Sequence, residues 1–204
     1  MNKLGGQLTI PIEVSARHIH LSEADFRELF GEEPIAVKRK LSQPGQFSAE
    51  QTVTVRGPQG EIGNVRLVGP LRDETQIELA VSDCRKLGID PHFALSGMLN
   101  GSPGAFLIGP TGSVALGRGA IVALAHLHMD PSEASSFGLV HLDHVTVTIR
   151  GARTVSLHNV VVRAREGVDK LSLHIDIDEA NTIGSLENAS IISLEKSACG
   201  SGCI

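Results

Sequence analysis

A repeated His-x-His motif is the feature that most constrains this chain. His18-Ile19-His20 follows an apolar, strand-like run, and His126-Leu127-His128 follows another. Side chains alternate along an extended strand, so both histidines of a motif face the same side and can bind one metal ion. A single motif would equally fit two histidines that happen to share a strand face, but two copies in matching contexts favour a metal site.

The segments that follow the two motifs also match. Each continues with a Ser or Asp helix cap, a Glu just behind it, and a short helix that ends at Phe-Gly, over residues 22–31 in the first copy and 130–138 in the second. We interpret this as an internal duplication of a whole unit.

Many short strands at near-regular spacing, with one small helix per unit, predict a mainly β protein with short helices. We expect two similar small β-barrels from the duplication, over residues 1–118 and 119–204, which together form one compact unit. A doubly wound parallel sheet is not favoured, because no long helices alternate with the strands.

Composition excludes several classes of protein. The net charge is -5 and the chain has no Trp and no Tyr, so neither phosphate neutralisation nor base stacking supports a nucleic-acid binder. No apolar run approaches the roughly 18 residues of a membrane span. We therefore expect no nucleic-acid partner and no membrane association.

The cysteines and the N-terminus indicate a cytoplasmic protein. Three cysteines give no disulfide framework, and residues 1–10 have no signal-peptide pattern, so a reducing cytosol fits best. We expect Cys84, on a short helix, to be buried. We expect Cys199 and Cys203 to be exposed in the Gly/Ser-rich tail.

Each histidine pair needs a further ligand, and a late strand in each half offers one. Glu78 lies in the predicted strand 75–81, and His174 lies in the predicted strand 171–177. Two histidines with a carboxylate, or three histidines, with open positions left over, are typical of catalytic zinc, although other transition metals also suit such sets. A solvated Glu78 and a half-buried structural His174 are the alternatives.

Two further positions can bind an anion. Arg72 lies in the loop after Gly69-Pro70, where a guanidinium can bind phosphate through two hydrogen bonds next to a metal. Ser96-Gly97 can offer a hydroxyl and a backbone N–H to an oxyanion. A surface arginine and an ordinary turn are the alternatives.

Taken together, these segments closely resemble the PduL-type phosphate acyltransferases, also called phosphate propanoyltransferases. The resemblance covers roughly residues 7–184. It rests on matched segments in order: 15–21 (SARHIHL), 41–47 (LSQPGQF), 65–72 (VRLVGPLR), 75–78 (TQIE), 96–97 (SG), 126–129 (HLHM) and 174–181 (HIDIDEAN).

The resemblance implies two β-barrels, two Zn²⁺ ions per chain, and transfer of an acyl group between coenzyme A and inorganic phosphate. The acyl-CoA would be short, such as propionyl- or acetyl-CoA. The implied ligands of one zinc are His18, His20 and Glu78, and those of the other are His126, His128 and His174. Arg72 resembles the family's catalytic arginine and Ser96 its partner at the phosphate. The positions that match the coenzyme A site are Ser15, Lys40, Arg66, Val68 and Asn181.

The chain departs from the family pattern at two places. The family usually has Arg directly before its second His pair and a polar residue before Ser-Gly, whereas this chain has Ala125 and Leu95. These changes leave the metal ligands intact and leave phosphate affinity and acyl preference open. The other functions considered are a metal-dependent thioester hydrolase and a non-catalytic regulator that binds metal or coenzyme A.

Many family members enter bacterial microcompartments, for example in propanediol degradation, by an N-terminal amphipathic helix. Residues 1–10 are too short and too Gly-rich for such a helix. We therefore expect a cytoplasmic form, or one that reaches a microcompartment lumen by other means, and a homo-oligomer is compatible with the sequence.

Overall fold

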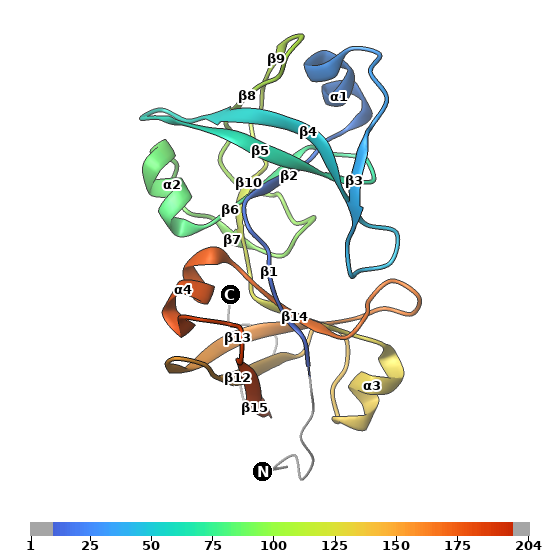
Figure 1. Cartoon of the computed structure of the whole chain (residues 1–204), viewed down its shortest axis with the longest axis vertical. Coiled ribbons are helices and arrows are strands. Elements are labelled where there is room, and N and C mark those ends of the chain that lie inside the picture. The colour runs from blue at the N-terminus through green and yellow to red at the C-terminus, as the bar shows by residue number, and fades with distance from the viewer. Residues whose placement is uncertain (1–9, 198–204) are drawn as a thin grey trace. The chain divides into compact units, whose positions relative to one another are not determined.

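The computed structural model describes residues 10–197 of the chain. These residues divide into two compact units, which are described separately (Figure 1). One unit is Ala16–Ala123. The other combines the described residues before Ala16 with those from Leu124 onward. No helix among the described residues is long and apolar enough to cross a membrane.

The unit Ala16–Ala123 is built on a curled nine-stranded sheet with the order β7-β10-β6-β2-β5-β4-β8-β9, and β3 pairs with β4. Its strands are β2 (His18–His20), β3 (Val37–Lys40), β4 (Phe47–Arg56), β5 (Glu61–Gly69), β6 (Gln76–Leu79), β7 (Phe93–Ala94), β8 (Phe106–Ile108), β9 (Ser113–Ala115) and β10 (Ala120–Ala123). Its helices are α1 (Glu23–Phe30) and α2 (Val81–Leu87).

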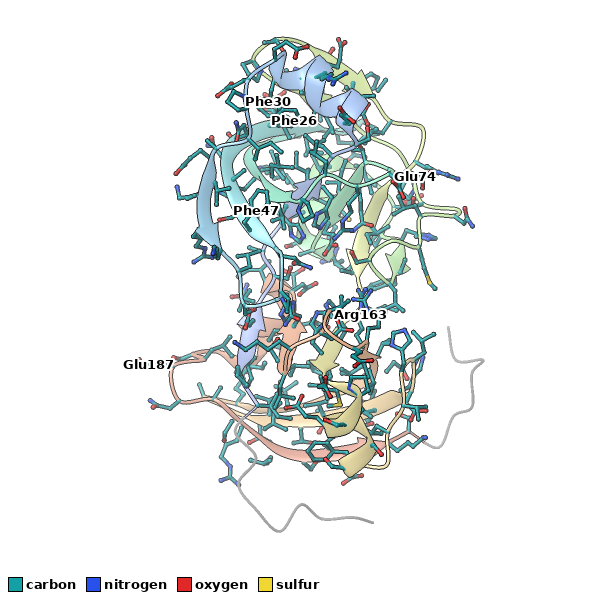
Figure 2. All side chains as sticks on the ribbon, turned by 90° about the vertical axis from the view of Figure 1, so that its right-hand side faces the viewer. Phe26, Phe30, Phe47, Glu74, Arg163 and Glu187 are labelled. Carbon is teal, nitrogen blue, oxygen red and sulfur yellow. The ribbon has the colours of Figure 1, made fainter. Side chains whose placement is uncertain are left out.

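Local sequence signals account for the first elements of this unit. The Ser22 hydroxyl caps α1 by accepting a hydrogen bond from the Asp25 N–H, as the predicted cap requires. The apolar face of α1 buries Phe26 and Phe30, whose rings pack 5.1 Å apart (Figure 2). A turn at Gly57–Gly60 joins β4 to β5, and its Gly57 N–H donates to the Gly60 carbonyl.

The second unit is built on a six-stranded sheet with the order β1-β14-β11-β13-β12-β15. Its strands are β1 (Ile12–Val14), β11 (His126–Met129), β12 (His144–Arg150), β13 (Thr154–Ala164), β14 (Ser172–Ile175) and β15 (Ser190–Lys196). Its helices are α3 (Pro131–Ser136) and α4 (Ile177–Ile183). A core of Leu127, Val147, Val162 and Leu173, with others around them, lies against this sheet.

The two sheets repeat one pattern of pairing around their histidine strands. Strand β2 lies between antiparallel β6 and parallel β5, and β11 lies between antiparallel β14 and parallel β13. The registers also match, because His18 is opposite Glu78 and His126 is opposite His174. This agreement confirms the predicted duplication and the mainly β class with two small barrel-like units.

The strand that pairs with the outer side of β6 or β14 is exchanged between the two copies. Strand β1 immediately precedes β2 in the chain but pairs in parallel with β14, and β10 immediately precedes β11 but pairs in parallel with β6. The units therefore change at Ser15/Ala16 and at Ala123/Leu124, whereas the sequence led us to expect 1–118 and 119–204. The matching segments around the two His-x-His motifs reveal the repeat, but they do not reveal which sheet the preceding strand joins.

Helix α4 and strand β15 were not predicted from the sequence, and the structure tests only one of the cysteine predictions. Helix α4 begins with a capping box between Asp176 and Glu179, and β15 pairs with β12. Cys84 is buried, as predicted. Cys199 and Cys203 lie outside the described residues.

Candidate active site

The first candidate metal site lies across two neighbouring strands. Strand β2 carries His18 and His20, and antiparallel β6 carries Glu78 opposite His18. The two Nε2 atoms are 3.2 Å apart, and the Glu78 carboxylate lies 3.5 Å from His18 Nε2 and 3.7 Å from His20 Nε2. Ligand atoms about 2.1 Å from a tetrahedral metal are about 3.4 Å apart, so these spacings fit one ion.

Hydrogen bonds fix the tautomers of both histidines. The Nδ1 atom of His18 is 2.9 Å from the Ala16 carbonyl oxygen, and the Nδ1 atom of His20 is 2.8 Å from the Val68 carbonyl oxygen. A carbonyl oxygen only accepts, so each Nδ1 carries the hydrogen and each Nε2 presents a lone pair. Two lone pairs and a carboxylate therefore converge on one point, which is an arrangement that a cation stabilises.

Burial and neighbouring side chains together determine the protonation states of His20 and Glu78. Burial lowers the pKa of His20 to about 4, against the opposing hydrogen bond with Glu78. Burial alone would raise the pKa of Glu78, but the neighbouring His18 and His20 lower it well below its ordinary value. The site thus presents neutral imidazole and ionised carboxylate at neutral pH, which are the protonation states that bind a metal.

The second unit holds a trio of histidines in the equivalent place. His126, His128 and His174 lie on β11 and β14, and one nitrogen of each lies within 4.8 Å of those of the other two. The His126 Nδ1 atom is 2.8 Å from the Leu124 carbonyl oxygen, which again leaves Nε2 for a ligand. Burial and the neighbouring His126 and His174 together lower the pKa of His128 to about 3.

The structure places Arg72 and Ser96 in one hydrogen-bond network with Glu78. Arg72 Nη1 donates to Ser96 Oγ at 3.0 Å, and Gln76 Nε2 donates to the same oxygen at 2.9 Å. Gln76 Nε2 also donates to Glu78 Oε1 at 2.6 Å, while Gln76 Oε1 accepts the Gly97 N–H at 2.7 Å. The predicted anion-binding pair is therefore coupled to the predicted metal ligand through one buried amide.

Sequence reasoning missed three residues that contact these groups. Gln76 forms the network just described, and strand alternation already places its side chain on the same face as Glu78. Asp169 Oδ1 lies 2.6 Å from His128 Nδ1, and Glu13 Oε2 lies 3.5 Å from His174 Nε2. The register of β1 on β14 places Glu13 opposite His174, but that pairing could not be known before the fold.

The predicted coenzyme A residues are divided between the units. Lys40, Arg66 and Val68 lie in the unit Ala16–Ala123, whereas Ser15 and Asn181 lie in the other. Lys40 and Asn181 are exposed. Arg66 Nη1 donates to the Ala49 carbonyl at 2.8 Å, and Val68 is buried with its carbonyl against His20. The structure thus gives Val68 a contact with a predicted ligand, and the coenzyme A assignments stay predictions.

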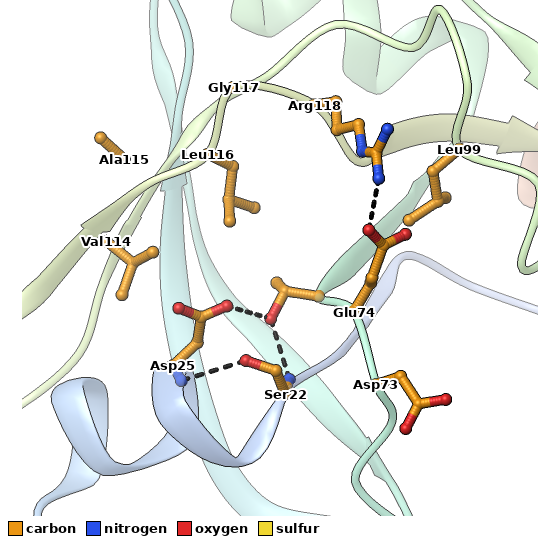
Figure 3. A pocket seen from close by; sticks show the side chains of 11 residues that line it. Ser22, Asp25, Asp73, Glu74, Leu99, Val114, Ala115, Leu116, Gly117 and Arg118 are labelled. Carbon is orange, nitrogen blue, oxygen red and sulfur yellow. Dashed lines mark hydrogen bonds and ion pairs between the residues drawn. The ribbon is translucent and has the colours of Figure 1, made fainter.

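A groove of about 500 Å³ lies elsewhere in the unit Ala16–Ala123 (Figure 3). Among the residues that line it, the Thr75 hydroxyl donates to Asp25, and Glu74 pairs with Arg118. None of the residues predicted to bind metal, phosphate or coenzyme A is among those that line it. The groove is therefore separate from the candidate site.

Comparison with known proteins agrees with the motifs. The profile of the phosphate propanoyltransferase family matches residues 11–186. A phosphate propanoyltransferase of Rhodobacter capsulatus is 47% identical over 188 residues, which cover 92% of this chain and 86% of that protein. Those of Citrobacter rodentium and Salmonella typhimurium are 48% and 46% identical, and the aligned regions cover 86% and 88% of this chain and 84% and 85% of the two proteins. The chain therefore belongs to the phosphate propanoyltransferase family, a family of phosphate acyltransferases, as the motifs of its sequence predicted.

Proposed function

We propose that this chain interconverts a short-chain acyl-CoA and inorganic phosphate with acyl phosphate and free coenzyme A. A phosphate oxygen attacks the thioester carbonyl carbon, a C–O bond forms, and the C–S bond breaks. The proton of hydrogen phosphate is transferred to the leaving thiolate, so atoms and charge balance. Cys84 is buried on α2, and we propose direct attack by phosphate without a cysteine acyl-enzyme.

The observation that carries this proposal is the link from Arg72 and Ser96 to Glu78 through Gln76. A guanidinium in this place can neutralise and orient phosphate, and the Ser96 hydroxyl and Gly97 segment can help to position it. Because Gln76 holds the serine and the carboxylate at fixed spacing, phosphate bound by Arg72 lies near the Glu78 site.

We further propose that each trio of donors holds one zinc ion. The support is the fit already described: neutral Nε2 lone pairs and an ionised Glu78 with spacings near those of tetrahedral ligands. When bound, zinc would supply Lewis-acid polarisation of an oxygen and a ligand position for a thiolate. Lys40 and Arg66 offer positive charge for the phosphates of coenzyme A in the same unit as Arg72.

The first test replaces the proposed phosphate arginine. In Arg72→Ala we expect kcat for phosphate-dependent thiol release from propionyl- or acetyl-CoA to fall about 100-fold or more, because one preorganised charge is lost. Zinc content and thermal stability should stay near those of the wild type. Arg56→Ala is the matched control, since Arg56 lies in the same unit and forms an exposed ion pair with Glu61. Nearly unchanged activity in a zinc-replete Arg72→Ala protein would refute the assignment.

Dependence of thiol release on phosphate distinguishes the acyltransferase from the two alternative functions, a thioester hydrolase and a non-catalytic regulator. A thioester hydrolase would release free thiol without phosphate, whereas the proposed enzyme requires phosphate and yields acyl phosphate. A regulator that binds metal or coenzyme A would show no turnover. Absence of thiol release from a zinc-replete sample with both acyl groups would exclude the proposed reaction.

Two further family properties stay predictions. Size-exclusion chromatography coupled to light scattering would test the homo-oligomeric state. Fractionation of cells would test association with a microcompartment against a cytoplasmic location.

A further inference from the structure

A buried carboxylate lies directly behind one histidine of the second site. The Asp169 side chain is fully buried in the segment between β13 and β14, and its Oδ1 lies 2.6 Å from His128 Nδ1. Arg165 closes the other side of this carboxylate with two hydrogen bonds, from Nε to Oδ2 at 2.8 Å and from Nη2 to Oδ1 at 2.9 Å. Hydrogen bonds therefore link His128, Asp169 and Arg165 in series, with the carboxylate between the imidazole and the guanidinium.

The group that accepts a hydrogen bond from Nδ1 of His128 differs from the acceptors at three other histidines of the candidate sites. His18, His20 and His126 each direct Nδ1 at a backbone carbonyl oxygen at 2.8–2.9 Å. His128 alone among these four directs it at a carboxylate, and at a shorter distance. A charged acceptor makes the hydrogen bond stronger and makes the opposite ring nitrogen a better electron donor.

The carboxylate next to His128 offsets a difference in charge between the two ligand sets. The trio of His18, His20 and Glu78 includes a carboxylate, whereas the trio on β11 and β14 is all imidazole. A divalent cation on three neutral imidazoles lacks a negative neighbour in its own ligand set, and Asp169 supplies one through His128. Arg165 holds the same carboxylate in place, because it donates two hydrogen bonds to it.

We propose that Asp169 is a positioning residue that orients His128 and strengthens metal binding at the three-histidine site, with Arg165 holding its carboxylate. This inference rests on the proposed zinc sites. Asp169 acts only on the His126, His128 and His174 site, because it contacts His128 and lies in that unit. The site of His18, His20 and Glu78 does not depend on it.

The test measures zinc, not turnover. Purified wild-type protein is loaded with Zn²⁺, its zinc content is measured, and the ion is withdrawn by titration with a competing chelator. In Asp169→Asn, which keeps the shape and an acceptor oxygen but removes the charge, we expect one of two zinc ions to bind about 10–100-fold more weakly. The other ion should keep its wild-type affinity.

Two further variants make the result specific. Asp143→Asn is the matched control, because Asp143 pairs with Lys196 and caps a turn in the same unit. Glu13→Gln tests the rival carboxylate near His174. Asp143→Asn should keep both affinities. A loss in Glu13→Gln as large as expected for Asp169→Asn, with Asp169→Asn unchanged, would assign the charge to Glu13 and overturn the proposal.

Arg165→Gln separates an electrostatic role from a merely structural one. This change leaves the Asp169 carboxylate and its hydrogen bond to His128 but removes the two hydrogen bonds from Arg165, so zinc should bind somewhat more weakly than in the wild type and clearly more tightly than in Asp169→Asn. If Arg165→Gln and Asp169→Asn both lose zinc to the same extent, the segment acts as a structural support and the proposal fails. Absence of zinc from wild-type protein would overturn the zinc sites themselves, whereas two normal affinities in Asp169→Asn would overturn only this inference.

Discussion

The carboxyl group of Glu179 gives a stability prediction with a definite sign. Burial, together with the nearby Asp176 and Asp178 charges, raises its pKa from 4.5 to about 7, against a hydrogen bond from the Asp176 N–H. The folded protein therefore binds this proton more tightly than the unfolded chain does. The resulting stabilisation is fully present below about pH 4.5 and is lost as the pH rises through about 7.

The magnitude follows from the size of the shift. One pKa unit corresponds to about 1.4 kcal/mol, so the change from 4.5 to about 7 sets an upper limit of about 3 kcal/mol. Glu179 is only half-buried, and solvent screening reduces this figure to about 1–2 kcal/mol. In Glu179→Gln the charge disappears while an oxygen remains to accept the Asp176 N–H. We expect the free energy of unfolding to rise by that amount at about pH 8.5 and to change little at about pH 4.5.

Urea unfolding of the chelator-treated protein, followed by far-UV circular dichroism at both pH values, measures this effect. Tryptophan fluorescence does not serve, because the chain has no Trp. Glu187→Gln, at an exposed position, is the control and should change stability little at either pH. An equal gain in Glu179→Gln at both pH values, or a loss at the higher one, would refute the reasoning.

Four further substitutions test helix capping and packing, each by the same unfolding measurement. Ser22→Ala removes the side-chain cap of α1 and should cost about 1 kcal/mol. Leu127→Ala, at a fully buried position between two site histidines, should cost about 3–5 kcal/mol, and a cost below about 1 would contradict the described core. Gly104→Ala should cost more than about 2 kcal/mol, because its Cβ would lie 1.8 Å from the Leu116 carbonyl oxygen, whereas Gly117→Ala meets no atom within 4 Å and should be nearly neutral.

The features that the sequence predicted are those encoded by neighbours along the chain. The caps of α1 and α3 and the hairpin at Gly57–Gly60 depend on residues within a few positions of one another. Strand alternation places both histidines of each pair on one face for the same reason. The late strand of each half offered Glu78 and His174, which the family resemblance also implies, and the structure brings each next to its histidine pair.

The features that it did not predict depend on distant pairing or on irregular backbone. Asp169 lies in a turn segment with no periodic pattern, so its hydrogen bond to His128 becomes visible only when β13 and β14 are placed. Helix α4 is short, and its capping box, Asp176 with Glu179, is the local signal that could have revealed it. The sheet that β1 or β10 joins depends on contacts between residues far apart in the sequence, which a local pattern does not contain.

The exchange of β1 and β10 has a consequence for how the chain is synthesised. A ribosome releases β1 early, yet its partner β14 emerges only after most of the chain has been made, since Ile12 pairs with Leu173. The unit with His18 and Glu78, by contrast, has all its strands once Ala123 has emerged. Vectorial synthesis therefore favours completion of the carboxylate-containing site first, while β1 remains without its partner strand until β14 has emerged.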